Sequence, residues 1–283
     1  MSTDYIFLMS SPDRAGILAA VAESIAGCGG DIRDAASFGD ADSGEFFIRI
    51  HLAAQASMPE KALRQALAAM AARFDGRWQL VDATRRPRVA IAVSKFDHCL
   101  SDLLNRVRNG SLAIDVPFVV SNHEDAKVLA DWHGIEFHHL PVTRETRAHQ
   151  ELKMRELFAS HAIDLVVLAR YMQILSPKLS AELSGRCINI HHSFLPSFKG
   201  AMPYKQAHER GVKLIGATAH YVTDALDEGP IIEQDVRRVT HATSADEMAS
   251  LGREIESSVL ARAVRWHTEH RVLFNGSKTV VFS

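Results

Sequence analysis

The sequence contains little cysteine, and the few cysteines are scattered. Its 283 residues include three of them, Cys28, Cys99 and Cys187, and no two form a Cys-x-x-Cys pair. An odd number of distant cysteines predicts neither a disulfide framework nor a zinc ribbon. This usage is typical of the reducing cytoplasm, where we expect the protein to reside.

The sequence also lacks a charge imbalance and long apolar runs. Its net charge is −2 at pH 7, which gives no electrostatic reason to expect nucleic acid or an anionic membrane as a partner. No run approaches the ~20 apolar residues that span a bilayer, and the first residues do not resemble a signal peptide. With 47% hydrophobic and 23% charged residues, we expect a soluble chain of two domains.

The first part of the sequence alternates between short strand and helix patterns. Apolar and alternating runs predict four strands, at residues 5–9, 32–38, 45–52 and 77–82. Helices are expected from a cap at Asp13 to about Cys28, and over residues 59–73. A turn-rich stretch at 39–44 predicts a hairpin between the second and third strands. The order βαββαβ is that of a ferredoxin-like unit.

After a basic connector at residues 85–88, the pattern changes to apolar strands separated by helices. Strands are predicted at 89–93, 116–120, 165–169, 187–190 and 216–223, and helices at 99–107, 125–133 and 145–161. Strands that are apolar throughout indicate a mainly parallel, Rossmann-like sheet covered on both faces. The ligand crevice of such a sheet lies at the carboxyl ends of its strands.

Polar residues whose side chains could take part in catalysis lie at two of these strand ends. Asn189 and His191 are two positions apart, so both side chains point to the same side of their strand. An amide and an imidazole placed side by side can stabilise an oxyanion that forms on a carbonyl group. Asp227, in a turn-rich loop, could raise the pKa of His191 or orient a water molecule. From spacing alone, an ordinary strand terminus and a turn aspartate remain alternatives.

A wider motif surrounds these residues. Asn189-Ile190-His191 is followed by Ser193, Leu195-Pro196 and Lys199-Gly200, and then by His220 and Asp227. This pattern resembles the core of the folate-dependent formyltransferases. The resemblance implies that Asn189, His191 and Asp227 are catalytic. It also implies that the substrate is bound by Met172, Gln173, Ile174 and Leu175, through backbone groups on the pterin ring, and by His192 and His220.

The first segment, with Pro12-Asp13-Arg14-Ala15-Gly16-Ile17, resembles an ACT domain. The resemblance implies an effector site formed by Asp13, Arg14, Ala15, Gly16 and Ile17, with methionine or glycine as candidate effectors. It also implies a homo-oligomer, a dimer or a tetramer. Ala15 stands where the family pattern has proline. A capped turn that serves only folding and subunit pairing remains the alternative for this segment.

An ACT domain followed by a formyltransferase-like domain is the arrangement of the formyltetrahydrofolate deformylases. The resemblance places an ACT-like regulatory or oligomerisation domain at residues 1–84 and a catalytic domain at 85–283. It implies a hydrolase that acts on a linear amide. Such an enzyme converts 10-formyltetrahydrofolate to formate and tetrahydrofolate, without a prosthetic group, in one-carbon metabolism and purine biosynthesis.

Two departures from the transferase pattern favour water as the acceptor of the formyl group. Residues 94–98 contain no glycine to bring backbone N–H groups close to a substrate phosphate. His192 stands where the transferases usually have proline. The alternatives are a formyltransferase that uses an amine acceptor, and an amino-acid sensor without catalytic activity.

Adjacent histidines raise the question of a metal. His138-His139 and His191-His192 are consecutive pairs, and consecutive strand residues point to opposite faces, so neither pair is expected to chelate an ion. We therefore expect no catalytic metal.

Overall fold

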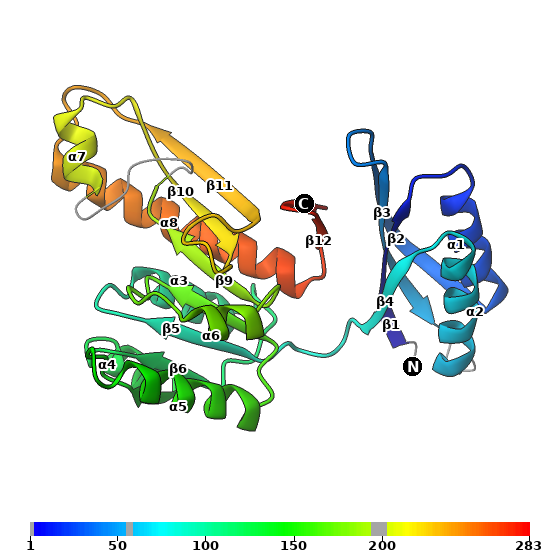
Figure 1. Cartoon of the computed structure of the whole chain (residues 1–283), viewed down its shortest axis with the longest axis horizontal. Coiled ribbons are helices and arrows are strands. Elements are labelled where there is room, and N and C mark those ends of the chain that lie inside the picture. The colour runs from blue at the N-terminus through cyan, green and yellow to red at the C-terminus, as the bar shows by residue number, and fades with distance from the viewer. Residues whose placement is uncertain (1–2, 55–58, 194–202) are drawn as a thin grey trace. The chain divides into compact units, whose positions relative to one another are not determined.

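The computed structural model describes residues 3–54, 59–193 and 203–283. The chain divides into two compact units, drawn in Figure 1: unit 1 comprises Met1–Arg86 and Glu269–Ser283, and unit 2 comprises Pro87–Thr268. The expected second domain, residues 85–283, therefore needs a correction at its end. Residues 269–283 belong to unit 1 because their side chains complete its hydrophobic core.

Unit 1 contains a four-stranded antiparallel sheet in the order β2-β3-β1-β4. Its elements are β1 Thr3–Pro12, α1 Ile17–Gly27, β2 Gly30–Asp40, β3 Glu45–Ala54, α2 Glu60–Arg73 and β4 Arg77–Asp82. This order and pairing confirm the predicted ferredoxin-like βαββαβ unit. Figure 1 shows α1 and α2 on the same side of this sheet.

Alternation along β1 and β3 separates the two faces of the unit 1 sheet. Phe7 and Ile50 point to the face covered by α1 and α2 and are fully buried. Ile6, Leu8 and Phe47 point to the opposite face, where they pack against residues from the end of the chain. Both faces of this sheet are therefore covered, each by a different part of the sequence.

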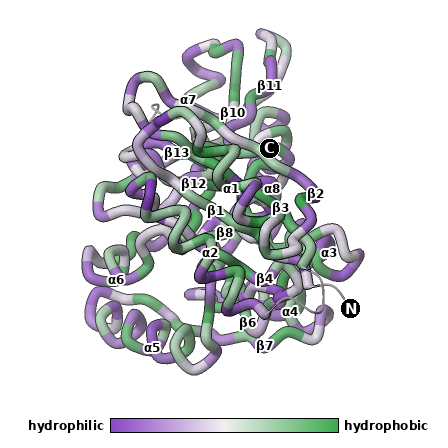
Figure 2. The backbone as a smooth tube through the Cα atoms, turned by 90° about the vertical axis from the view of Figure 1, so that its right-hand side faces the viewer, coloured by the Kyte–Doolittle hydropathy of each residue, from purple (hydrophilic) through white to green (hydrophobic). Residues whose placement is uncertain are grey.

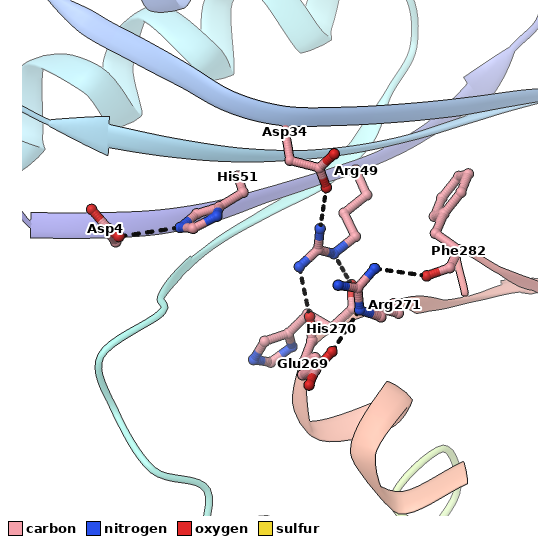
Figure 3. A network of polar contacts seen from close by, with 8 residues as sticks. All are labelled: Asp4, Asp34, Arg49, His51, Glu269, His270, Arg271 and Phe282. Atoms are coloured by element: carbon pink, nitrogen blue, oxygen red, sulfur yellow. Dashed lines mark hydrogen bonds and ion pairs between the residues drawn. The ribbon is translucent and has the colours of Figure 1, made fainter. Parts of the chain in front are cut away.

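The cover of the second face is a hairpin formed by β12 Val272–Asn275 and β13 Lys278–Val281. Its Leu273 completes the apolar cluster of that face. Arg49 on β3, only 4% exposed, donates hydrogen bonds to the backbone oxygens of Glu269 and His270, each at 3.0 Å (Figure 3). A salt bridge of 3.2 Å to Asp34 uses its remaining nitrogen. A buried guanidinium thus ties the carboxyl-terminal segment to the sheet.

The start of α1 differs from the prediction. The helix begins at Ile17, and its N-cap is Gly16, which has a φ of 92° and makes no side-chain cap hydrogen bond. Asp13 is not the cap, because β1 continues to Pro12 and the Asp13 N–H donates to the carbonyl oxygen of Gly44. The backbone makes its turn at glycine, which adopts this left-handed conformation without steric cost.

Unit 2 contains a seven-stranded sheet in the order β11-β10-β9-β8-β5-β6-β7. Its elements are β5 Val89–Val93, α3 His98–Arg108, β6 Phe118–Ser121, α4 Lys127–Trp132, β7 Glu136–His139, α5 Arg147–Ser160, β8 Leu165–Ala169, α6 Pro177–Glu182, β9 Cys187–His191, α7 Pro203–Glu209, β10 Leu214–Tyr221, β11 Ile231–Arg238 and α8 Ala245–Thr268. The five strands from β9 to β7 are parallel, and β10 and β11 are antiparallel to their neighbours. The prediction of a mainly parallel sheet is confirmed.

Helices cover both faces of this sheet, as its fully buried strands require. Ala90 and Val166 point toward Met154 and Phe158 of α5. The alternate strand positions face the other side, where α8 packs along β9 and β10 and against α3. The tube of α5 alternates between hydrophilic and hydrophobic colours in Figure 2, and the helix buries Gln150, Met154 and Phe158.

The strand order places a topological switch point between β5 and β8. From β5 the chain proceeds outward to β6 and β7, and it then returns to the other side of β5 as β8. In open α/β sheets the loops that leave the carboxyl ends of two such strands diverge, and the crevice between them is the usual ligand site. No helix among the described residues is long and apolar enough to span a membrane.

Candidate active site

The predicted catalytic residues lie around the carboxyl end of β9. Asn189 and His191 are partly exposed, whereas the alternate residues Ile188 and Ile190 are buried, so the two polar side chains share one side of the strand as predicted. His220 of β10 is the register partner of Asn189. The Asn189 Nδ2 lies 3.3 Å from the Nε2 of His220, so antiparallel pairing brings a third polar group to the site.

Asp227 reaches the same site from the loop between β10 and β11. Its Oδ2 lies 3.3 Å from His191 Nδ1, and its Oδ1 lies 3.7 Å from His220 Nε2. Asp227 adopts a φ of 58°, a conformation that few residues other than glycine and asparagine or aspartate adopt. Gly229 allows this loop to lie against β10, because a Cβ there would overlap the carbonyl oxygen of Tyr221. The structure therefore brings Asn189, His191 and Asp227 together.

The electrostatics of this site favour an ionised carboxylate. Hydrogen bonds from His191 and His220 hold the pKa of Asp227 well below its usual range, although partial burial opposes them. The Nδ1 of His220 lies 2.9 Å from the carbonyl oxygen of Tyr221, a contact that requires a proton on Nδ1. The His191 ring is oriented by Asp227 at Nδ1, which leaves its Nε2 for a reactant.

His192 does not point away from His191, and this corrects the expectation from strand geometry. The two rings stack with centroids 4.8 Å apart and an interplanar angle of 25°. The cause is that β9 ends at His191, so His192 already lies in a bend. Burial, assisted by the positive charge of Arg170, lowers the pKa of His192 to about 4. His192 is therefore neutral near pH 7 and adds no charge to the site.

The expected substrate loop, residues 172–175, follows β8. The hydroxyl of Ser94 at the end of β5 accepts a hydrogen bond of 2.9 Å from the Met172 N–H and donates to Asn122 at 2.7 Å. The side chains of Met172 and Ile174 are 55% and 59% exposed, whereas Leu175 is buried and Gln173 is partly exposed. Two large apolar side chains are thus presented to solvent beside a polar site.

A buried charged cluster lies beside this loop and was not foreseen from the sequence. Glu256 of α8 is 1% exposed and lies 2.8 Å from His98 Nε2 and 3.4 Å from Arg170 Nε. The Tyr204 hydroxyl donates to it at 2.7 Å. Burial raises the pKa of Glu256, but the hydrogen bond from His98 and the charge of Arg170 outweigh this and lower it. A glutamate inside the apolar stripe of α8, next to Ile255 and Val259, was the available signal.

The same cluster contains the one group of metal-ligand type found among the described residues. Donor atoms of His98, Cys99 and Glu256 lie within 4.8 Å of one another. His98 and Glu256 already hydrogen-bond each other, and burial raises the pKa of the Cys99 thiol well above its usual range. A protonated thiol is a poor ligand, so this arrangement fits a hydrogen-bonded cluster better than a metal centre.

The predicted effector residues form the turn between β1 and α1. Asp13, Arg14 and Ala15 are exposed, Gly16 is the helix N-cap and Ile17 is buried in the core. Arg14 forms an exposed salt bridge of 2.8 Å with Asp75.

Of the motif residues quoted above, Leu195, Pro196, Lys199 and Gly200 lie outside the described residues.

Comparison with known proteins agrees with this fold and site. The sequence profile of the formyl transferase family matches residues 87–264. A formyltetrahydrofolate deformylase of Corynebacterium sp. (strain P-1) is 46% identical over 279 residues, which cover 98% of this chain and 97% of that protein. The chain therefore belongs to the formyl transferase family.

Solved structures narrow this assignment. The crystal structure of formyltetrahydrofolate deformylase from Burkholderia mallei matches with a TM-score of 0.94 and 48% identity, over 99% of this chain and 100% of that chain. Glycinamide ribonucleotide transformylase 1 from Symbiobacterium toebii matches with a TM-score of 0.64 and 28% identity, over 70% of this chain and 95% of that chain. Relatives that match along nearly the whole length are named formyltetrahydrofolate deformylases, and the chain is a member of that group.

Proposed function

We propose that this protein hydrolyses 10-formyltetrahydrofolate to formate and tetrahydrofolate, in one-carbon metabolism and purine biosynthesis. The observation that carries the proposal is the convergence of Asn189, His191 and Asp227 at one strand end, with His191 oriented by the carboxylate of Asp227. Relatives named for this activity match nearly the whole chain, which supports the same conclusion.

In the proposed reaction, Asn189 and His191 donate hydrogen bonds to the formyl oxygen. Water adds to the formyl carbon, and negative charge develops on that oxygen. Preorganised donors stabilise this charge more strongly than they stabilise the substrate, which lowers the barrier. The bond from the formyl carbon to N10 then breaks, N10 takes up a proton, and formate leaves.

Asp227 acts in this proposal as an orienting carboxylate. A proton acceptor is most effective when its pKa lies near the working pH, and the pKa of Asp227 is held far below that. The carboxylate instead holds the His191 ring in place and can hydrogen-bond the attacking water.

We assign the folate ring to the loop at residues 172–175, with His192 and His220 at the edge of the reacting centre. The exposed side chains of Met172 and Ile174 offer apolar contacts, and the backbone of the loop offers hydrogen-bonding groups. Ser94 holds the first of these residues in place. No prosthetic group is needed for this chemistry, and the cytoplasm is the expected compartment.

Unit 1 is proposed to be an ACT domain that senses an amino acid or joins subunits into a dimer or tetramer. Its βαββαβ topology and the turn at Asp13 to Ile17 support the proposal. Calorimetry with methionine and with glycine tests the effector role, and light scattering tests the assembly. An absence of heat with both ligands would leave the turn a purely structural element.

The proposed activity is tested by incubation of the protein with 10-formyltetrahydrofolate alone. Release of free formate and tetrahydrofolate in equal amounts is the expected result. Turnover that requires an added amine would instead indicate a formyltransferase, and no turnover under either condition would indicate a non-catalytic sensor.

A further inference from the structure

The crevice between β5 and β8 is the natural place for a ligand in this sheet, because the loops after these strands diverge there. The loop after β5 leads to Phe96 and His98, and the loop after β8 begins with Arg170. The proposed formyl site lies one strand away from this crevice, at the end of β9. A second reactant that approached the formyl carbon through this crevice would pass between the two loops.

Large side chains fill this crevice. Glu256 is almost fully buried, and it is hydrogen-bonded or ion-paired to groups from the loop after β8, from α3 and from α7. Arg170 is 11% exposed and His98 is 17% exposed. The guanidinium of Arg170 also lies 5.9 Å from the ring centroid of Phe96. The crevice is therefore occupied by a buried cluster of hydrogen-bonded and ion-paired side chains.

Tyr204 completes this cluster from α7. Its ring lies across α8 at Gly252, where any side chain would overlap the phenol ring and its hydroxyl. Burial, together with the negative charge of Glu256, raises the pKa of Tyr204 well above its usual range, so the hydroxyl stays protonated and donates to the carboxylate. A glycine on one helix and a tyrosine on another are thus complementary in shape.

We propose that Tyr204, seated on Gly252 and bonded to Glu256, blocks the acceptor side of the crevice and so restricts the acceptor of the formyl group to water. This inference rests on the proposed hydrolase function and adds a specificity-determining residue to it. In this inference the small water molecule needs no displacement of Tyr204, whereas an amine that carries further atoms would displace it and leave Glu256 without one of its donors.

The chemistry of the two outcomes differs only in the nucleophile. In hydrolysis a C–O bond to water forms, the bond from the formyl carbon to N10 breaks, and N10 gains a proton. In transfer a C–N bond to the amine forms, the same bond to N10 breaks, and the proton lost by the amine balances the proton gained by N10. No oxidant or metal enters either route, so access of the nucleophile can decide between them.

The test uses 10-formyltetrahydrofolate with a ¹³C-labelled formyl group and glycinamide as the amine probe. Wild-type protein and Tyr204→Phe, which keeps the ring, are expected to give labelled formate at any amine concentration. Tyr204→Ala is expected to give labelled formylglycinamide, with a transfer-to-hydrolysis ratio at least tenfold above that of wild type. Gly252→Ala, which displaces the ring without removing it, is expected to shift the ratio in the same direction.

The outcomes separate this inference from the function on which it rests. If folded Tyr204→Ala and Gly252→Ala release formate and form no amide, the inference is wrong and the hydrolase function stands. Equal transfer by wild type and by the variants would also overturn the inference. If wild type releases no formate, the hydrolase function itself fails. Should Tyr204→Ala not fold, Gly252→Ala decides alone, and thermal melts report the folded state of each.

Discussion

The two units each bury a charged side chain, and the partners of these side chains differ. Arg49 in unit 1 donates to backbone carbonyl oxygens of the carboxyl-terminal segment. Glu256 in unit 2 is bonded to side chains from separate elements, and its charge acts on His192 at the edge of the proposed reacting centre. A buried charge that satisfies backbone groups holds a fold together. A buried charge that binds side chains from several elements at the carboxyl edge of a parallel sheet fixes the positions of those side chains.

The largest expected effect lies in unit 2 and concerns catalysis. Asn189→Ala removes one oxyanion donor, so kcat for formate release should fall about 10²–10³-fold with little change in the melting temperature. The control is Asn105→Ala, at an exposed position of α3, which should leave kcat unchanged. A wild-type rate in Asn189→Ala would contradict the role given to this amide.

In unit 1 the expected effect is on stability. Arg49→Ala leaves two partly buried carbonyl oxygens without their donor, so the free energy of unfolding should fall by about 2–3 kcal/mol. The kcat of the protein that remains folded should not change. Arg77, whose salt bridge to Glu45 is exposed, provides the control: Arg77→Ala should cost less than about 1 kcal/mol. Denaturant titration followed by circular dichroism measures both.

A smaller effect is expected from pH. The pKa of His192 is about 4 in the folded protein and ~6.5 in an unfolded chain. Between these values the unfolded chain binds the proton and the folded protein does not, so stability falls as the pH decreases from 6.5 to 4. The free energy of unfolding is therefore expected to be higher at pH 7 than at pH 5, and His192→Asn should reduce this difference by about 1–2 kcal/mol. The exposed His241 serves as the matched control, since His241→Asn should leave the difference intact.

The smallest effect is expected at the turn of unit 1. Arg14→Ala removes an exposed salt bridge to Asp75, which should cost about 0.5 kcal/mol or less. If the turn binds an amino acid, the same variant should weaken that binding measurably in a calorimetric titration. A variant that binds as tightly as wild type would exclude Arg14 from the effector site.

Much of the fold follows from local pattern. The apolar runs at Val89–Val93 and Leu165–Ala169 predicted two strands at their observed bounds, because such runs fit only a sheet buried on both faces. The hairpin that covers unit 1 was not predicted, because its partners on β1 and β3 lie more than 200 positions away in the sequence. Helix α8 was missed as well, and with it Glu256.

The site was predicted only in part, because local sequence pattern relates some of its residues and not others. Asn189 and His191 share one strand, so period-two alternation relates them without further information. Asp227 joins them through a left-handed backbone conformation and a close approach at Gly229, and the motif rather than the spacing indicated it. His98, Tyr204 and Glu256 come from three different elements, and no local pattern connects them. Tertiary packing alone brings them together.

The discontinuity of unit 1 has a consequence for biosynthesis. Its first 86 residues leave the ribosome long before its last segment, which begins at Glu269. At ~5–20 residues per second the delay is roughly 10–40 s. During that time Ile6, Leu8 and Phe47 have no cover, and Arg49 has no backbone partners from the carboxyl-terminal segment. The apolar face of the unit that is synthesised first therefore stays uncovered until synthesis of the chain is almost complete.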